Sequence, residues 1–221
     1  MTTFCKVEKR CAVCGALNEC EDMASSNSFG SPDLDTRPPE MLRSTIFTWV
    51  QRCWKCGYCA SDISEAFPEA APMVRSSEYV RQLKDPSYPD LARSFLCKAL
   101  LEEKAENYSG AAWSLVYAAW ACDDYGKKTS ARLCRSRGAD MIQKSLEKKQ
   151  SISEQEGAET IILVDLFRRA SRLEEALELI CKERSGIKEE ILLQILVFQE
   201  DLIARKDVEC HTISEALGED A

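Results

Sequence analysis

The chain has 221 residues, of which 45% are hydrophobic and 30% are charged. This length and apolar content allow one medium-sized domain and a small appended module to bury apolar surface, and they argue against a disordered chain. The formal net charge of −8 disfavours a protein that attracts nucleic acid or anionic membranes through a general positive field, although it is compatible with a local basic patch.

Cysteine usage and the first residues predict a cytoplasmic protein. The chain contains 12 cysteines but begins Met-Thr-Thr-Phe-Cys-Lys-Val-Glu-Lys-Arg, without the apolar core of a secretion signal, so we expect reduced or metal-bound thiols. Residues 107–122 are the longest conspicuous uncharged stretch, and they are fewer than the roughly 20 that a membrane helix needs. We predict a buried soluble helix there. Cysteines within helical patterns are expected to be small buried residues: Cys97, Cys122, Cys134 and Cys181.

Two Cys-x-x-Cys-Gly knuckles follow segments with strand character. Thr3 to Arg10 leads into Cys11-Ala-Val-Cys14-Gly15, and Ser44 to Arg52, rich in β-branched and aromatic residues, leads into Cys53-Trp-Lys-Cys56-Gly57. Each turn brings two thiolates to one side of a tight loop, where the Gly takes backbone angles that a side chain would hinder. Two such turns complete a tetrahedral site, so this order predicts a zinc ribbon. The predicted ligands are Cys11, Cys14, Cys53 and Cys56.

The segment between the knuckles predicts a long, ordered or partly ordered loop. Met23 to Glu40 is dense in turn-forming residues. It carries Asp33, Asp35 and Arg37 close together, among prolines that restrict the backbone. Rigid charged loops of this kind can bind a peptide or a small ligand. We favour the alternative, in which the carboxylates cap turns or pair with Arg37 or Arg43 and fasten the loop to the ribbon.

The composition changes near Ser61 to Pro72, which predicts two domains: a split zinc-ribbon module over 1–62 and a helical domain over 63–221. Apolar residues recur at helical spacing in the second domain. The predicted helices cover 92–100, 112–120, 129–149, 159–170, 172–182 and 187–205. The fold class is therefore α+β and mostly α, a small N-terminal zinc ribbon followed by tetratricopeptide-like antiparallel helical hairpins. A compact helical bundle is the alternative, because the chain lacks a clean repeat of about 34 residues.

We predict one zinc ion per chain. Thiolates without His or carboxylate at knuckle spacing suit closed, four-coordinate zinc, which leaves no position for catalysis. Iron is the alternative, since paired knuckles also hold one iron in rubredoxins, and Cys59 extends the second knuckle to a triple spacing that resembles ferredoxins. The further Cys that a ferredoxin requires is absent, because residue 63 is Ile. Cys5 and Cys20 are substitute ligands by position, but we expect free thiols there.

These residues resemble a bacterial family of domains of unknown function, the one numbered two-two-two-five, whose members join a split zinc ribbon to tetratricopeptide-like helices. The matching pieces are the first knuckle, the loop from Phe29 to Met41, and Trp49-Val-Gln-Arg-Cys53-Trp-Lys-Cys56-Gly-Tyr58. The segments 112–123 and 167–177 are similar more loosely, so the resemblance covers most of the chain. It implies a cytoplasmic zinc-ribbon scaffold with no established activity. Cys59 departs from the small or apolar residue expected after Gly-Tyr, which leaves the iron alternative open.

No catalytic constellation stands out, so we predict that the protein is not an enzyme. His211 is the only histidine and cannot form a triad of the usual pattern. The paired carboxylates Asp123 and Asp124 are expected to be ordinary helix-surface or helix-end groups.

The surface chemistry predicts a protein or peptide partner rather than nucleic acid. The densest basic stretch is diluted by Asp140 and Glu147, which makes a nucleic-acid-binding regulator the weaker alternative. Its cations are Arg132, Arg135, Arg137, Lys144, Lys148 and Lys149. Trp113, Tyr117 and Trp120 can line a partner groove, though we expect at least two of them in the core. Our hypothesis is a non-enzymatic protein-interaction scaffold, with a rubredoxin-like electron-transfer protein as the rival.

Overall fold

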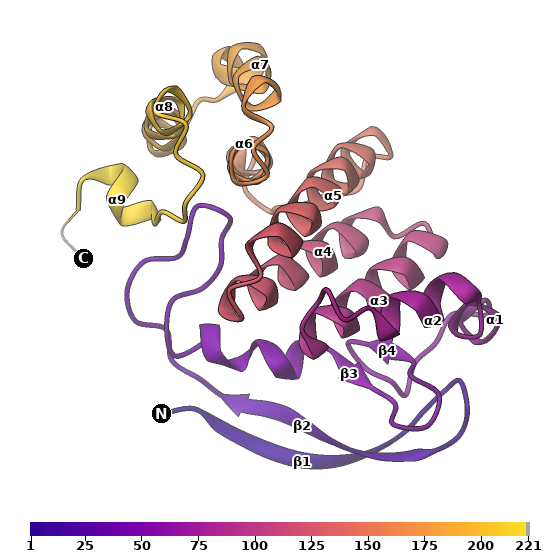
Figure 1. Ribbon diagram of the computed structural model, residues 1–221. Coiled ribbons are helices and arrows are strands. Elements are labelled where there is room, and N and C mark those ends of the chain that lie inside the picture. The colour runs from indigo at the N-terminus through magenta and orange to yellow at the C-terminus, as the bar shows by residue number, and fades with distance from the viewer. Residues whose placement is uncertain (220–221) are drawn as a thin grey trace.

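The computed structural model describes residues 1–219 as a small β region packed against a larger set of helices (Figure 1). This confirms a mostly helical α+β protein with its strands at the N-terminus. The β region contains two antiparallel sheets, one for each knuckle. Their strands are β1 (Thr3–Arg10) with β2 (Leu17–Ser25), and β3 (Gln51–Arg52) with β4 (Cys59–Ala60).

Each knuckle is the turn of its own hairpin. In the first, the Gly15 N–H donates to the Cys11 carbonyl at 2.8 Å, and in the second, the Gly57 N–H donates to the Cys53 carbonyl at 2.9 Å. Both glycines lie in the left-handed region, with φ of 73° and 76°, which Gly adopts without the steric penalty of a Cβ. The same local geometry therefore forms twice, for the same local reason.

Two local expectations between the knuckles are wrong. The loop expected from Met23 begins only after β2, and the strand expected over 44–52 is mostly a 3-10 helix, η1 (Arg43–Trp49). Within η1 the Thr45 hydroxyl donates to the Leu42 carbonyl at 2.8 Å. Such local bonds from side chain to backbone support a helical turn and here outweigh the β propensity of the composition.

The helices predicted from periodicity all form. The helical elements are α1 (Ala70–Val74), α2 (Ser77–Lys84), α3 (Asp90–Lys104), α4 (Tyr108–Asp124), α5 (Lys128–Glu147), α6 (Ala158–Arg169), α7 (Leu173–Glu183), η2 (Arg184–Gly186), α8 (Glu190–Ala204) and α9 (Ile213–Leu217). α4 begins at Tyr108, where the Asn107 side chain accepts from the Gly110 N–H at 3.2 Å and caps the helix. The short helices α1, α2 and α9 and the turn η2 were not predicted.

Successive helices pack on one another in chain order, α3 on α4, α4 on α5, α5 on α6 and α6 on α7 (Figure 1). Connections of three residues join α3 to α4, α4 to α5 and α6 to α7, and short connections make such neighbours antiparallel. α8 packs against α6 and α7, and the small helix α9 packs against α8. The helices thus form one curved stack that begins beside β3 and β4 and ends at α8 and α9.

One continuous core joins the β region to the helices. It extends from the knuckle residues Cys11 and Cys53 through the helices to Leu202. Trp49 of η1 packs edge-on against Tyr117 of α4, with ring centroids 5.1 Å apart. The expected boundary between residues 62 and 63 falls in the connection between β4 and α1. Because one core spans both sides of this boundary, the division into two separate domains stays a prediction.

Within the part of the chain that the structure describes, no helix is both long enough and apolar enough to cross a membrane.

Candidate metal centre and inserted loop

The predicted ligands lie together in space. The Sγ atoms of Cys11, Cys14, Cys53 and Cys56 all lie within 4.8 Å of one another. Across the two knuckles, Cys11 Sγ lies 3.7 Å from Cys56 Sγ, and Cys14 Sγ lies 3.6 Å from Cys53 Sγ. Tetrahedral zinc with Zn–S bonds of about 2.3 Å separates its sulfurs by about 3.8 Å. The two distances across the knuckles therefore match those around one four-coordinate metal ion.

Backbone amides favour a thiolate at this cluster. Burial raises the pKa of Cys53, but the N–H groups of Cys56 and Lys55 donate to its sulfur and, with the Cys14 thiol, lower the pKa to about 7. Burial and the neighbouring thiols raise the pKa of Cys56 instead. Four thiols in one place do not ionise together by themselves, whereas a divalent cation deprotonates its thiol ligands. The donor set is thus suited to a cation and supplies four ligands.

The remaining cysteines near the cluster do not belong to it. Cys59 is buried, and its thiol donates to the Gly57 carbonyl at 3.3 Å. A hydrogen bond to Cys59, together with burial, raises the pKa of Cys97, which places these two thiols side by side in the core. Cys5 is exposed, and Cys20 is buried outside the ligand set. The triple spacing at the second knuckle therefore reflects packing of its third cysteine against α2 and α3.

Every cysteine is a free thiol in the structure. Cys97, Cys122 and Cys134 are buried, as expected from their helical positions. Cys181 is exposed, and the expectation of burial there is wrong because α7 turns only a narrow stripe, including Ala176 and Ile180, toward the core.

The two ribbon halves are joined by more than the cysteines. The Ala12 N–H donates to the Ile63 carbonyl at 2.8 Å, and the Gln51 amide donates to Asp22 at 2.9 Å. On the helical side, the Tyr79 hydroxyl of α2 donates to the Gly57 carbonyl at 2.9 Å. The cysteine cluster is therefore fixed both between the two hairpins and against the helices.

The loop between the knuckles inserts its Asp35 side chain into the helical stack. Asp35 is fully buried, and its Oδ2 accepts hydrogen bonds from Trp120 Nε1 at 2.8 Å and Arg169 at 2.8 Å. Arg135 lies 3.5 Å from the same oxygen. These three residues belong to α4, α6 and α5, so one carboxylate joins three helices.

The charges around Asp35 are balanced by further acidic groups. Asp123, beside the loop, accepts from both Arg135 and Arg169, the latter at 3.0 Å. Burial acts to raise the pKa of Asp35, but the coulombic effect of Arg169 and Arg135 and the hydrogen bond from Trp120 outweigh it and hold the pKa below its ordinary value. Asp35 is thus an ionised carboxylate in a dry, paired site.

Neighbouring loop residues extend this attachment. Arg37 binds both carboxylate oxygens of Asp124 at 2.7 and 2.8 Å. Asp33 pairs with Arg43, as expected from the sequence, but Asp35 and Arg37 fasten the loop to the helices and not to the ribbon. That part of the expectation is wrong. Asp123 and Asp124 lie at the C-terminal end of α4, as expected for helix-end groups, but they also take part in this attachment: Asp124 pairs with Arg37 of the loop, and Asp123 pairs with the arginines around Asp35.

The C-terminal segment covers the same loop. The Leu34 N–H donates to the His211 carbonyl at 2.9 Å, and the Ile213 N–H donates to the Pro32 carbonyl at 2.9 Å. In Figure 1 the loop after β2 rises beside α9, which agrees with this short antiparallel bridge. The His211 ring nitrogens lie 3.1 Å from carboxylates of the neighbouring turns and are thereby paired.

The aromatic residues considered for a partner groove lie mainly in the core. Trp120 is buried, and Trp113 and Tyr117 are half-buried in one cluster with Trp49. Arg135, one of the cations of the basic stretch, is also not free to contact a partner, because it is 1% exposed and bound to carboxylates.

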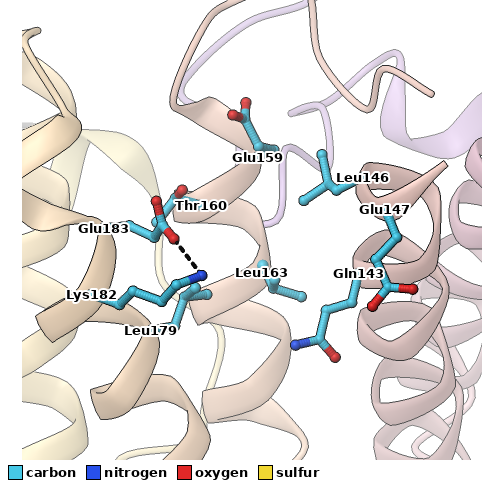
Figure 2. Close-up of a pocket in the computed structure, with 9 residues that line it drawn as sticks. All are labelled: Gln143, Leu146, Glu147, Glu159, Thr160, Leu163, Leu179, Lys182 and Glu183. Carbon is cyan, nitrogen blue, oxygen red and sulfur yellow. Dashed lines mark ion pairs between the residues drawn. The ribbon is translucent and has the colours of Figure 1, made fainter. Parts of the chain in front are cut away.

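A separate hollow of about 360 Å³ lies between α5, α6 and α7 (Figure 2). Figure 2 shows α6 between the two other helices, with Leu163 at the centre and Lys182 turned toward Glu183 of its own helix, 2.9 Å away. The lining residues are Gln143, Leu146, Glu147, Glu159, Thr160, Leu163, Leu179, Lys182 and Glu183. The leucines and carboxylates of this hollow provide a surface for contact with another molecule. Its lining residues do not include a nucleophile hydrogen-bonded to a base.

No protein-family model, curated protein or solved structure matches the chain. The resemblance to the family of zinc-ribbon scaffolds therefore depends on the residues quoted for it.

Proposed function

We propose that the protein is a non-enzymatic interaction scaffold for a protein or peptide partner, in which one structural zinc ion holds a split ribbon closed on a tetratricopeptide-like helical array. The proposal includes a reducing, cytoplasmic setting, which the free thiols support. It also includes membership of the zinc-ribbon family that the knuckles and the inserted loop resemble.

The observation that carries the proposal is the path of the loop between the knuckles. Residues 15–52 leave the cysteine cluster and return to it, and near their midpoint Asp35 is buried among three helices. A metal bound by Cys11, Cys14, Cys53 and Cys56 closes the base of this excursion. The site has four protein ligands and so provides no open position for substrate, which supports a structural role for the ion.

The helices support an interaction role. Consecutive helices pack on one another and build a stack. Asp35 and its arginines fill one side from within the chain, so a partner is expected on surfaces that remain open, such as the hollow of Figure 2. An array of this kind presents side chains from several helices to one partner, which is the usual means by which helical repeats bind proteins.

Metal analysis and affinity capture test the proposal together. Protein purified from its source is expected to contain one zinc per chain by elemental analysis and to retain a reproducible protein partner after a wash in high salt. The control is Lys6→Glu, which reverses the charge of an exposed residue on β1 and is expected to retain both. Repeated capture without a partner contradicts the interaction role, whatever the metal content.

Iron is the second candidate, because a shell of four thiolates accepts iron as well as zinc. An iron protein of this type absorbs visible light and can transfer an electron, whereas the zinc protein is colourless. If the protein contains one iron per chain and shows a visible absorption band that disappears on reduction, the proposed function is electron transfer and not that of a scaffold. Nucleic-acid binding has less support from the structure, since Arg135 is committed to Asp35 and Asp123; salt-dependent binding of DNA or RNA is its test.

A further inference from the structure

Helix α8 is rich in apolar residues, and only part of its surface is covered by other helices. Its buried side, with Leu192, Leu196 and Leu202, packs on α6 and α7. On the outer side, Ile191 is 52% exposed and Val197 is 49% exposed. Exposed apolar residues on one side of a helix often mark a surface for interaction. The outer side of α8 therefore offers apolar surface that the described residues leave exposed.

The outer side of α8 and the small helix α9 form a groove of about 500 Å³, which we call the α8 groove. It is lined by Glu190, Leu193, Gln194, Val197, Phe198, Asp201 and Ala216. Phe198 is fixed at the α9 side by an edge-on contact with His211, with ring centroids 5.7 Å apart. The groove is thus built on a helix that is anchored in the core and is limited on one side by an ordered segment.

The charges of the α8 groove define the partner. Glu190, Gln194, Val197 and Asp201 follow one another at helical spacing along a single stripe, with carboxylates at its two ends. Leu193 and Phe198 line the groove beside this stripe and, with Val197, provide its apolar surface. Eleven residues of helix separate Glu190 from Asp201 by about 16 Å. The charged residues that line the groove are both acidic, so the complementary ligand is an apolar helix with one cation near each end.

A second copy of the chain does not provide this chemistry. Two α8 helices placed face to face bring the carboxylates of one copy, Glu190 and Asp201, against those of the other, and like charges directly opposite each other destabilise such a contact. Asp201 also has an intrahelical partner, Arg205, at 2.8 Å, which lies outside the groove lining.

We propose that the α8 groove binds an amphipathic helical segment of a partner protein, with an apolar stripe flanked by Lys or Arg. The inference rests on the proposed function as an interaction scaffold and names the chemistry of its partner. Apolar side chains of the partner contact Val197, Leu193 and Phe198, and its cations pair with Glu190 and Asp201 at the ends. Helix binding in an apolar groove commonly uses such spaced anchors, while rim charges select the partner.

The probe for this proposal is a synthetic peptide of about 16 residues that carries leucines on one helical stripe and lysines at its ends. A twin peptide replaces each lysine by glutamate. Fluorescence anisotropy with the full chain is expected to show at least tenfold tighter binding of the lysine peptide at low salt, and a smaller ratio at high salt because surface charges are screened.

Three variants locate the binding. Val197→Asp is expected to weaken the lysine peptide at least tenfold, whereas Leu133→Asp, at an apolar residue of α5 that is 54% exposed, leaves it unchanged. Glu190→Gln with Asp201→Asn, which changes only exposed groups, is expected to remove the preference between the two peptides. Circular dichroism confirms that each variant is folded.

Several results overturn the proposal. These are equal affinity for the two peptides, no binding of either one, an unchanged affinity in Val197→Asp, or a dimer by light scattering that Val197→Asp dissociates, which assigns the groove to a second copy. The failure of the groove is separable from the failure of the scaffold role, since a partner captured equally well by wild type and Val197→Asp retains the scaffold and rejects this surface.

Discussion

The substitution Asp35→Asn tests whether the inserted loop is part of the folded core. Asp35 is fully buried and accepts from Trp120 and Arg169, each at 2.8 Å. Asparagine has nearly the same shape, so the change removes the charge and leaves the volume. The expected result is a large loss of stability with unchanged metal content, because the ligand cysteines are not altered.

The magnitude follows from the burial of the pair. Removing one partner of a buried ion pair costs about 3–5 kcal/mol, because the other charge stays buried without compensation. Arg135 and Arg169 keep Asp123 as a second partner, which places the expected cost near the lower end, about 3 kcal/mol. For a domain stable by about 5–15 kcal/mol this is a substantial fraction.

Urea unfolding followed by circular dichroism measures the effect. The midpoint for Asp35→Asn is expected to fall by about 1 M or more. The matched control is Asp140→Asn. Asp140 is 50% exposed and forms an ion pair of 2.6 Å with Arg172, which this substitution breaks. An exposed pair contributes about 0–1 kcal/mol, so the control changes the midpoint little.

The pH dependence gives an independent check. Asp35 has a pKa below its ordinary value of 3.8 in the folded chain, so its contribution is present above that value and is lost as the pH falls through the folded pKa. The difference in unfolding free energy between wild type and Asp35→Asn is therefore expected to be constant near neutral pH and to shrink below about pH 4. Equal midpoints for Asp35→Asn and Asp140→Asn, or a difference that grows in acid, refute this account of the loop.

Three further predictions concern the metal and the loop. Cys53→Ser is expected to lose bound metal in elemental analysis while Cys59→Ser keeps one ion per chain; equal loss contradicts the ligand set. Trp120→Phe removes a donor to a buried carboxylate and is expected to cost about 1.5–3 kcal/mol in urea unfolding, more than Trp113→Phe, whose N–H donates to the neutral carbonyl of Ile152. Chelation of the metal at neutral pH is expected to expose residues 15–52 to limited proteolysis, mapped by mass spectrometry, whereas the metal-loaded protein resists; equal cleavage in both states argues against the clasp.

The parts of the fold that sequence patterns predict are those with short-range causes. Each knuckle depends on two cysteines three residues apart and on the next glycine, and both turns form as expected. The helices from α3 to α8 follow the spacing of their apolar residues. The 3-10 helix η1 is the informative failure, because its β-branched residues suggest a strand while hydroxyl bonds such as that of Thr45 to Leu42 support a turn.

The attachment of the loop was beyond sequence reasoning because its partners are far apart in the chain. Asp35 meets Trp120 and Arg169 across separations of 85 and 134 residues. One signal was present: α6 is an apolar helix that nevertheless contains Asp165, Arg168 and Arg169, and all three are buried. Charged residues within an apolar helix require buried partners, which a charged loop elsewhere in the chain can supply. A count of charges in the loop and in α6 therefore indicates a contact without identifying its pairs.

The proposed metal holds the two ends of residues 15–52 together, and Asp35 holds the middle of the same segment in the helices. In an unfolded chain, closing a loop of about 40 residues costs roughly 4 kcal/mol of entropy on the estimate used for cross-links. A metal that closes residues 15–52 at their base removes much of that cost before Asp35 is placed, and Asp35 in its site holds the two knuckles near each other before the metal binds. The two contacts are therefore linked, so each is stronger when the other is formed. The inserted loop is then the element through which metal binding is expected to stabilise α4, α5 and α6, the helices that Asp35 contacts.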